Sequence, residues 1–171
     1  MATRKSTSPP PPELPWSWHT SLGWRGQLKR IRRWQLRLRA AHDIRDAEDY
    51  MYAFFQLCYH LRDWLLSEKV LSESEVEQLF KRNVELRLCG DLANAIKHRK
   101  LNRPKQPREP SLAREYCGAG GGWFGPARSE TFTVLSDGRS FEVRSLADKC
   151  LAVWEGALMK HGLDTACPEI S

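Results

Sequence analysis

The sequence lacks paired cysteines, metal-ligand spacing and long apolar runs. Its five cysteines form no Cys-x-x-Cys pair and no Cys/His zinc pattern, so neither a metal nor a cofactor is predicted. Scattered cysteines in odd number indicate reduced thiols and a cytoplasmic location. No apolar stretch approaches the roughly 20 residues that a transmembrane helix needs, so no membrane contact is expected.

Common catalytic and targeting signals are also missing. The chain has no Gly-x-Ser-x-Gly motif, and its glycine-rich run at 118–122 is not followed by Gly-Lys-Ser/Thr. A serine nucleophile elbow and a P-loop are therefore not expected. The N-terminus turns to prolines at 9–12 instead of an apolar stretch, which excludes a secretory signal and predicts a disordered Pro-rich tail over residues 1–22.

Positive charge, in contrast, is present in excess and is unevenly placed. The net charge is +6, and the segment from Arg25 to Arg45 contains eight Lys and Arg residues but one acid, Asp43. A second basic run lies between Lys97 and Arg108. Such clusters are typical of proteins that contact RNA or another polyanion. They are also compatible with arginines that only solvate helix surfaces.

Apolar residues recur at spacings of three and four along most of the chain, which predicts helices. The segment from Asp43 to Asp46 is expected to form a break and to cap the next helix, either Ser72 or Ser74 is suited to cap the one after it, and Gly162 is suited to end a helix. The predicted helices lie at about 24–41 and 47–67, from the start signal at 72–75 to near Phe80, at 84–99 and at 145–161.

A β-hairpin is predicted near residues 130–144. Asp137-Gly138 separates two β-prone runs there, which is a strong hairpin signal. Residues 102–129, with prolines at 104, 107 and 110 followed by a glycine cluster, are expected to form a loop. The predicted fold is thus mainly α, a helical bundle with a β-hairpin in its C-terminal half and a final helix. It forms one domain over residues 23–163, with a C-terminal tail at 164–171.

A row of polar residues lies on the helix predicted at 84–99. Successive helical side chains turn by about 100°, so residues spaced by three and four share one face. A histidine near its ordinary pKa can pass protons at neutral pH, as a metal-independent ribonuclease requires. A polar row opposite an apolar one is equally what any surface helix shows. The polar row is Arg87, Asp91, Asn94 and His98, and the apolar row is Cys89, Leu92, Ala93 and Ile96.

His60, at the edge of the apolar face of the helix at 47–67, extends this candidate site. Asp63, three residues later, is placed to bind one ring nitrogen and fix the tautomer. If the two helices pack together, His60 and His98 are expected to face one pocket. Metal binding by the same imidazoles and carboxylates is an alternative that the spacing does not demand. The predicted catalytic residues are His98, Asn94, Asp91, Lys97, His60 and Asp63.

The first helix offers a separate binding surface. Arg30, Arg33 and Arg37 form a stripe that suits phosphate groups, and Trp24 and Trp34 are available to stack on bases. Arg87 is predicted as a further nucleic-acid contact. An acidic protein partner would suit the same stripe.

Two motifs carry a family resemblance: YHLRDWL at 59–65 and DLANxxKH at 91–98. With the Asp-Gly hairpin and the final helix, they make residues 24–163 similar to a group of uncharacterised bacterial proteins. More distantly, the helices resemble the HEPN superfamily of helical bundles. Many members of that superfamily are metal-independent ribonucleases of toxin–antitoxin and phage-defence systems, and they act as dimers.

The HEPN resemblance implies an RNA partner, a homodimer and a role for His98 as acid and base. Asn94 and Asp91 would orient His98, and Lys97 would stabilise phosphate charge. The usual motif has an Arg, often followed by a polar residue, and then His after four to six more residues, whereas Arg87 precedes His98 by eleven positions. Both a ribonuclease and a non-enzymatic protein-interaction module therefore remain as predictions.

Overall fold

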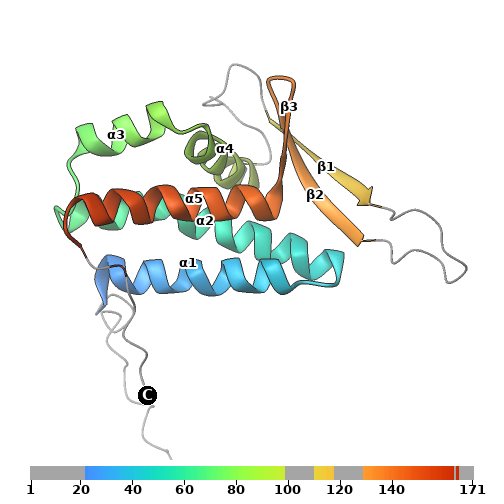
Figure 1. The fold of residues 1–171 in the computed structure, drawn as a ribbon, viewed down its shortest axis with the longest axis horizontal. Coiled ribbons are helices and arrows are strands. Elements are labelled where there is room, and N and C mark those ends of the chain that lie inside the picture. The colour runs from blue at the N-terminus through green and yellow to red at the C-terminus, as the bar shows by residue number, and fades with distance from the viewer. Residues whose placement is uncertain (1–21, 99–109, 118–128, 164, 166–171) are drawn as a thin grey trace, which may run out of the picture.

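The computed structural model describes residues 22–98, 110–117, 129–163 and 165. They form a helical bundle with a small sheet at one end (Figure 1), which confirms the predicted mainly-α fold with a hairpin and a final helix. The predicted tails lie almost wholly outside the described residues. The elements are α1 (Gly23–Ala40), α2 (Ile44–Ser67), α3 (Glu73–Arg82), α4 (Val84–His98), β1 (Ser111–Cys117), β2 (Ser129–Ser136), β3 (Arg139–Glu142) and α5 (Val143–Lys160).

Helices α1 and α2 run side by side in opposite directions, joined by a short connection (Figure 1). The Asp43 carboxylate accepts a hydrogen bond from the Arg45 N–H at 2.7 Å, so the predicted cap at this point is confirmed. The buried Gln27 amide donates to the Leu57 carbonyl at 3.0 Å. This bond fixes the register of the two helices inside an otherwise apolar interface.

The core lies where α2, α4 and α5 meet. Trp154 of α5 and Phe54 and Phe55 of α2 are fully buried there. Trp154 packs edge-on against Phe80 of α3, with ring centroids 6.0 Å apart. Aromatic rings of this size supply much of the apolar area that a bundle removes from water. Each helix of the bundle therefore contributes to one continuous core.

Strands β1, β2 and β3 form an antiparallel sheet in that order. Asp137 and Gly138, between β2 and β3, both have positive φ angles, of 50° and 72°. A two-residue hairpin turn with two positive φ angles is type I′, whose twist suits the flanking strands. The predicted hairpin is thus confirmed, and Val134 carries its inner face into the core.

Strand β1 corrects the expectation of a loop over 102–129, because residues 111–117 are extended and pair with β2. Leu112 lies opposite Val134, and Arg114 lies opposite Phe132. The segment has no clear alternation of apolar and polar residues, so its extended form depends on hydrogen bonds to a strand that follows later in the chain. The spacing of apolar residues within a segment cannot reveal that its extended form depends on a distant strand.

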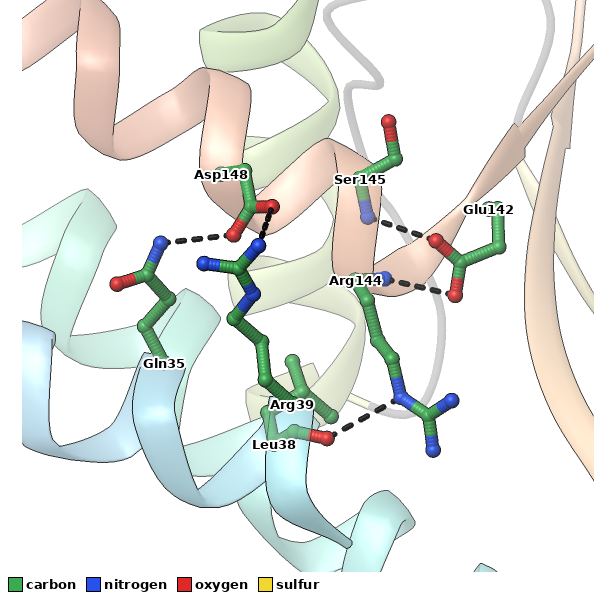
Figure 2. A network of polar contacts seen from close by, with 7 residues as sticks. All are labelled: Gln35, Leu38, Arg39, Glu142, Arg144, Ser145 and Asp148. Atoms are coloured by element: carbon green, nitrogen blue, oxygen red, sulfur yellow. Dashed lines mark hydrogen bonds and ion pairs between the residues drawn. The ribbon is translucent and has the colours of Figure 1, made fainter.

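The last helix begins two residues earlier than predicted, because Glu142 ends β3 and caps α5. Its carboxylate accepts hydrogen bonds from the backbone N–H groups of Arg144 and Ser145, at 3.0 and 2.7 Å (Figure 2). The Arg144 guanidinium donates to the carbonyls of Leu38 and Ala41 at the end of α1. The junction between β3 and α5 therefore also supplies hydrogen-bond donors to carbonyls at the C-terminal end of α1, which have no partner within that helix.

Helix α3 begins with a capping box. The Ser72 hydroxyl accepts from the Glu75 N–H at 3.3 Å, and the Glu75 carboxylate accepts from the Ser72 N–H at 2.8 Å. Replacing a Ser cap by Ala typically costs about 1 kcal/mol. We expect Ser72→Ala to lower the free energy of unfolding by about that amount, measured by urea denaturation. Ser145→Ala, at an exposed position of α5, is the control and should change it by less than about 0.5 kcal/mol.

The effect of Ser72→Ala should depend on pH. Hydrogen bonds from the Ser72 hydroxyl and backbone lower the pKa of Glu75 from its ordinary 4.5. A carboxyl group with a lowered folded-state pKa stabilises the fold above its ordinary pKa, and this contribution disappears as the pH falls through the lowered value. The stability difference between Ser72→Ala and wild type should therefore narrow in acid. An unchanged difference would contradict this role of the carboxylate.

Candidate nucleic-acid interface

Helix α1 contains no acid, and its cations divide between two faces. On the side toward α5, Arg32 Nη2 lies 2.6 Å from Glu155 Oε1. Arg39 Nη2 lies 3.4 Å from Asp148 Oδ2. Figure 2 shows that Asp148 also accepts a hydrogen bond from Gln35. The charges of these two arginines are thus countered within the bundle.

The solvent side of α1 keeps its charge. Arg25, Arg33 and Arg37 are exposed, whereas Lys29 and Arg30 are half-buried. Among the described residues, Lys29 and Arg33 have no acidic partner within ion-pair distance. Of the predicted stripe, Arg33 and Arg37 are exposed and Arg30 is half-buried, and its role in binding stays a prediction. We call this surface the basic face; it consists of Arg25, Lys29, Arg30, Arg33 and Arg37.

Aromatic rings hold part of the basic face in place. The Arg37 guanidinium lies 4.7 Å from the centroid of the Trp34 ring, which in turn lies 5.6 Å from the Tyr50 ring of α2. Contact with an aromatic face restricts a guanidinium without removing its charge. Trp24 behaves differently from the expectation: its side chain is 2% exposed, so the prediction that it stacks on bases is wrong.

The predicted polar row of α4 does not face solvent throughout. Asp91 is fully buried, as are its neighbours Gly90 and Leu92. The reason is that α4 contacts α2, α3 and α5 and is enclosed on more than one side. The whole polar row would face solvent only if α4 buried a single face. Asn94 is half-buried.

His60 and Asp63 pair as predicted, with His60 Nδ1 3.0 Å from Asp63 Oδ2. The second carboxylate oxygen accepts from Arg62 Nε, also at 3.0 Å. Both members of the His60–Asp63 pair are about half exposed, at 53% and 51%. A pair in this position is screened by water and adds little to stability.

Lys97 and His98 belong to the last turn of α4, and their side chains lie outside the described residues. Cys89 contacts the Phe55 carbonyl and so marks the crossing of α4 and α2. His98 follows Cys89 by nine residues, or about 13 Å of helix axis. A pocket shared by His60 and His98 stays a prediction, and this spacing does not favour it.

Arg87, the first residue of the predicted polar row, contacts the neighbouring helix α3. Its Nη1 donates to the carbonyls of Phe80 and Lys81, at 3.1 and 2.7 Å. These carbonyls belong to the last turn of α3, where no intrahelical donor remains for them. Arg87 therefore joins the end of α3 to the first turn of α4. Of the predicted polar residues, it lies closest in sequence to the start of α4.

Three buried cysteines were not among the predicted site residues. Cys58 of α2, Cys89 of α4 and Cys150 of α5 are at most 1% exposed. The Cys89 thiol donates to the Phe55 carbonyl at 3.5 Å, and the Cys150 thiol donates to the Glu85 carbonyl at 3.3 Å. In the sequence, only their position on apolar helix faces indicated that these thiols would be buried.

Burial raises the pKa of Cys89 and Cys150 well above the ordinary 9.0. At Cys58 burial also acts to raise the pKa, but hydrogen bonding with the neighbouring Cys150 and Cys89 thiols outweighs it and lowers the pKa to about 5. The thiolate is the reactive form of cysteine, and reagents must also reach it. We therefore assign these thiols to the packing of the core. The described residues contain no group of three or more His, Cys, Asp or Glu side chains arranged to hold a metal ion.

Comparisons with known proteins leave the function to be argued from this geometry. The chain matches no protein-family model, no curated protein and no solved structure at a significant level. The resemblance to the HEPN superfamily therefore stays a prediction. No helix within the described ranges is long and apolar enough to cross a bilayer.

The thiol assignment can be tested by alkylation. Iodoacetamide at mildly alkaline pH should leave Cys58, Cys89 and Cys150 unmodified in the folded protein, because burial withholds access to all three and a raised pKa also withholds the thiolate at Cys89 and Cys150. The same treatment in denaturant should modify all three, as mapped by peptide mass spectrometry. Rapid labelling of Cys89 in the native protein would contradict the assignment.

Proposed function

We propose that this protein binds RNA through the basic face of α1. The observation that carries the proposal is the division of charge on this helix: Arg32 and Arg39 have acidic partners on α5, whereas Arg33 and Lys29 have none among the described residues. Clustered cations that no neighbouring carboxylate neutralises create a positive potential. Such a potential attracts a polyanion and lets it displace bound counterions.

The residue types favour phosphate as the group that is bound. Four of the five cations are arginines, and a guanidinium can donate two parallel hydrogen bonds to one phosphate. Arg37, resting on the Trp34 ring, presents a planar group at a fixed angle. An arginine held in this way loses less side-chain entropy when it binds. RNA offers a repeated row of phosphates to match the row of arginines.

An acidic protein surface is the competing partner, and a salt titration separates the two. Neutralising each phosphate of a single strand contributes about 0.7 to the slope of log K against log salt concentration. Removing three contacts should reduce that slope by about 2. We expect the combined variant Arg30→Gln, Arg33→Gln and Arg37→Gln to show this reduction, together with at least about a tenfold loss of affinity at low salt. Fluorescence anisotropy with labelled single-stranded RNA gives both values.

A matched control removes the same charge elsewhere. Arg82, Arg139 and Lys149 are exposed and lie on α3, β3 and α5 instead of α1, so their combined change to Gln should leave the slope nearly unchanged. Equal losses in both variants would show that only net charge matters and would overturn the proposal. So would the absence of any RNA binding at low salt. Recovery of intact RNA in the presence of EDTA would distinguish binding from the predicted hydrolysis by His98.

A further inference from the structure

A surface pocket of about 400 Å³ lies between α2, α3 and the start of α4. Its volume falls in the range of small-molecule sites, about 300–1,000 Å³. Three cations stand against one carboxylate in its lining, and two apolar side chains complete the wall. The lining residues are Arg62, Val76, Glu77, Phe80, Lys81 and Arg87.

Two of the three cations are held in place by neighbouring groups. The Arg62 guanidinium lies 4.3 Å from the centroid of the Tyr59 ring, and its Nε donates to Asp63. Arg87 is held by the two carbonyls at the end of α3. Each of these contacts uses part of the donor set of the guanidinium, and an arginine has five N–H groups. Donors therefore remain for a ligand, in side chains that are already ordered.

The third cation, Lys81, is held by a weaker and more exposed contact. Lys81 Nζ lies 3.1 Å from Glu77 Oε2, and both side chains are well exposed, at 73% and 69%. An exposed i,i+4 pair contributes only a few tenths of a kcal/mol. A phosphate with two negative charges can replace Glu77 as the partner of Lys81 at little expense.

We propose that this pocket binds a 5′-phosphorylated nucleotide, either free or at the first position of an RNA. The phosphate would lie between Arg62, Lys81 and Arg87. The cavity is much larger than a lone phosphate requires, and Val76 and Phe80 give the sugar and base an apolar wall. The pocket is built by other helices than the one that carries the basic face, so the proposal does not rest on RNA binding by α1.

The test measures binding of AMP by isothermal titration calorimetry at low salt, with inorganic phosphate as a second titrant. We expect wild-type protein to bind AMP more tightly than inorganic phosphate. Lys81→Gln and Arg62→Gln should each weaken AMP binding about tenfold, as the loss of a charge-assisted contact predicts. Arg82→Gln is the matched control, because Arg82 follows Lys81 on the same helix but lines another cavity with Lys160 and His161.

Glu77→Gln supplies a gain of function that misfolding cannot imitate. Removing the carboxylate beside Lys81 should tighten AMP binding severalfold. A pair of short RNAs, one with a 5′-phosphate and one with a 5′-hydroxyl, then distinguishes the source of the nucleotide. Preference for the phosphorylated RNA over AMP assigns the pocket to an RNA end, and the reverse order assigns it to the free nucleotide.

Three results would overturn the proposal. One is the absence of AMP binding up to millimolar concentration. Another is equal weakening by Arg82→Gln and Lys81→Gln, which would show a general charge effect. The third is equal affinity for AMP and inorganic phosphate, which would leave the apolar wall without a role.

Discussion

The ion pairs between α1 and α5 divide the cations of α1 into two groups. Apolar residues bury one face of α1 (Trp24, Leu28, Ile31 and Leu38), and carboxylates of α5 counter the arginines on the side toward α5. Glu155 and Asp148 supply these, at 2.6 Å from Arg32 and 3.4 Å from Arg39. Because the apolar face fixes the rotation of α1 about its axis, Arg25, Arg33 and Arg37 are exposed, while Lys29 and Arg30 are half-buried. The basic face is thus a consequence of packing as much as of composition.

The two surfaces that we assign to ligands are built in different ways. The basic face belongs to one helix and offers a row of similar groups, which suits a long, repetitive partner. The pocket between α2, α3 and α4 gathers unlike groups from three helices around about 400 Å³, which suits a compact ligand. The buried middle of α4, around Asp91, separates the pocket near the start of the helix from His98 at its end.

Local signals in the sequence predicted most of the fold. The capping signals at 43–46 and 72–75 and the Asp137-Gly138 turn are short-range patterns, and the structure has a helix cap or a turn at each of them. The errors arose where position depends on distant partners. Strand β1 needs β2 to be extended, and Asp91 is buried because α4 is surrounded. The His60–Asp63 pair was predictable because it lies within one turn, whereas the pocket joining Arg62 to Arg87 depends on how helices cross.

The thiols of Cys58, Cys89 and Cys150 come from three helices that are well separated in the sequence, yet they share one core. While the fold is intact, no solvent oxidant reaches them. Opening the bundle exposes all three together, and an oxidant can then join two of them in a disulfide while their helices are apart. A disulfide formed in the open chain hinders the return to the native packing of three separate thiols. The working lifetime of this protein would therefore be governed by how often it opens and by how reducing its surroundings are.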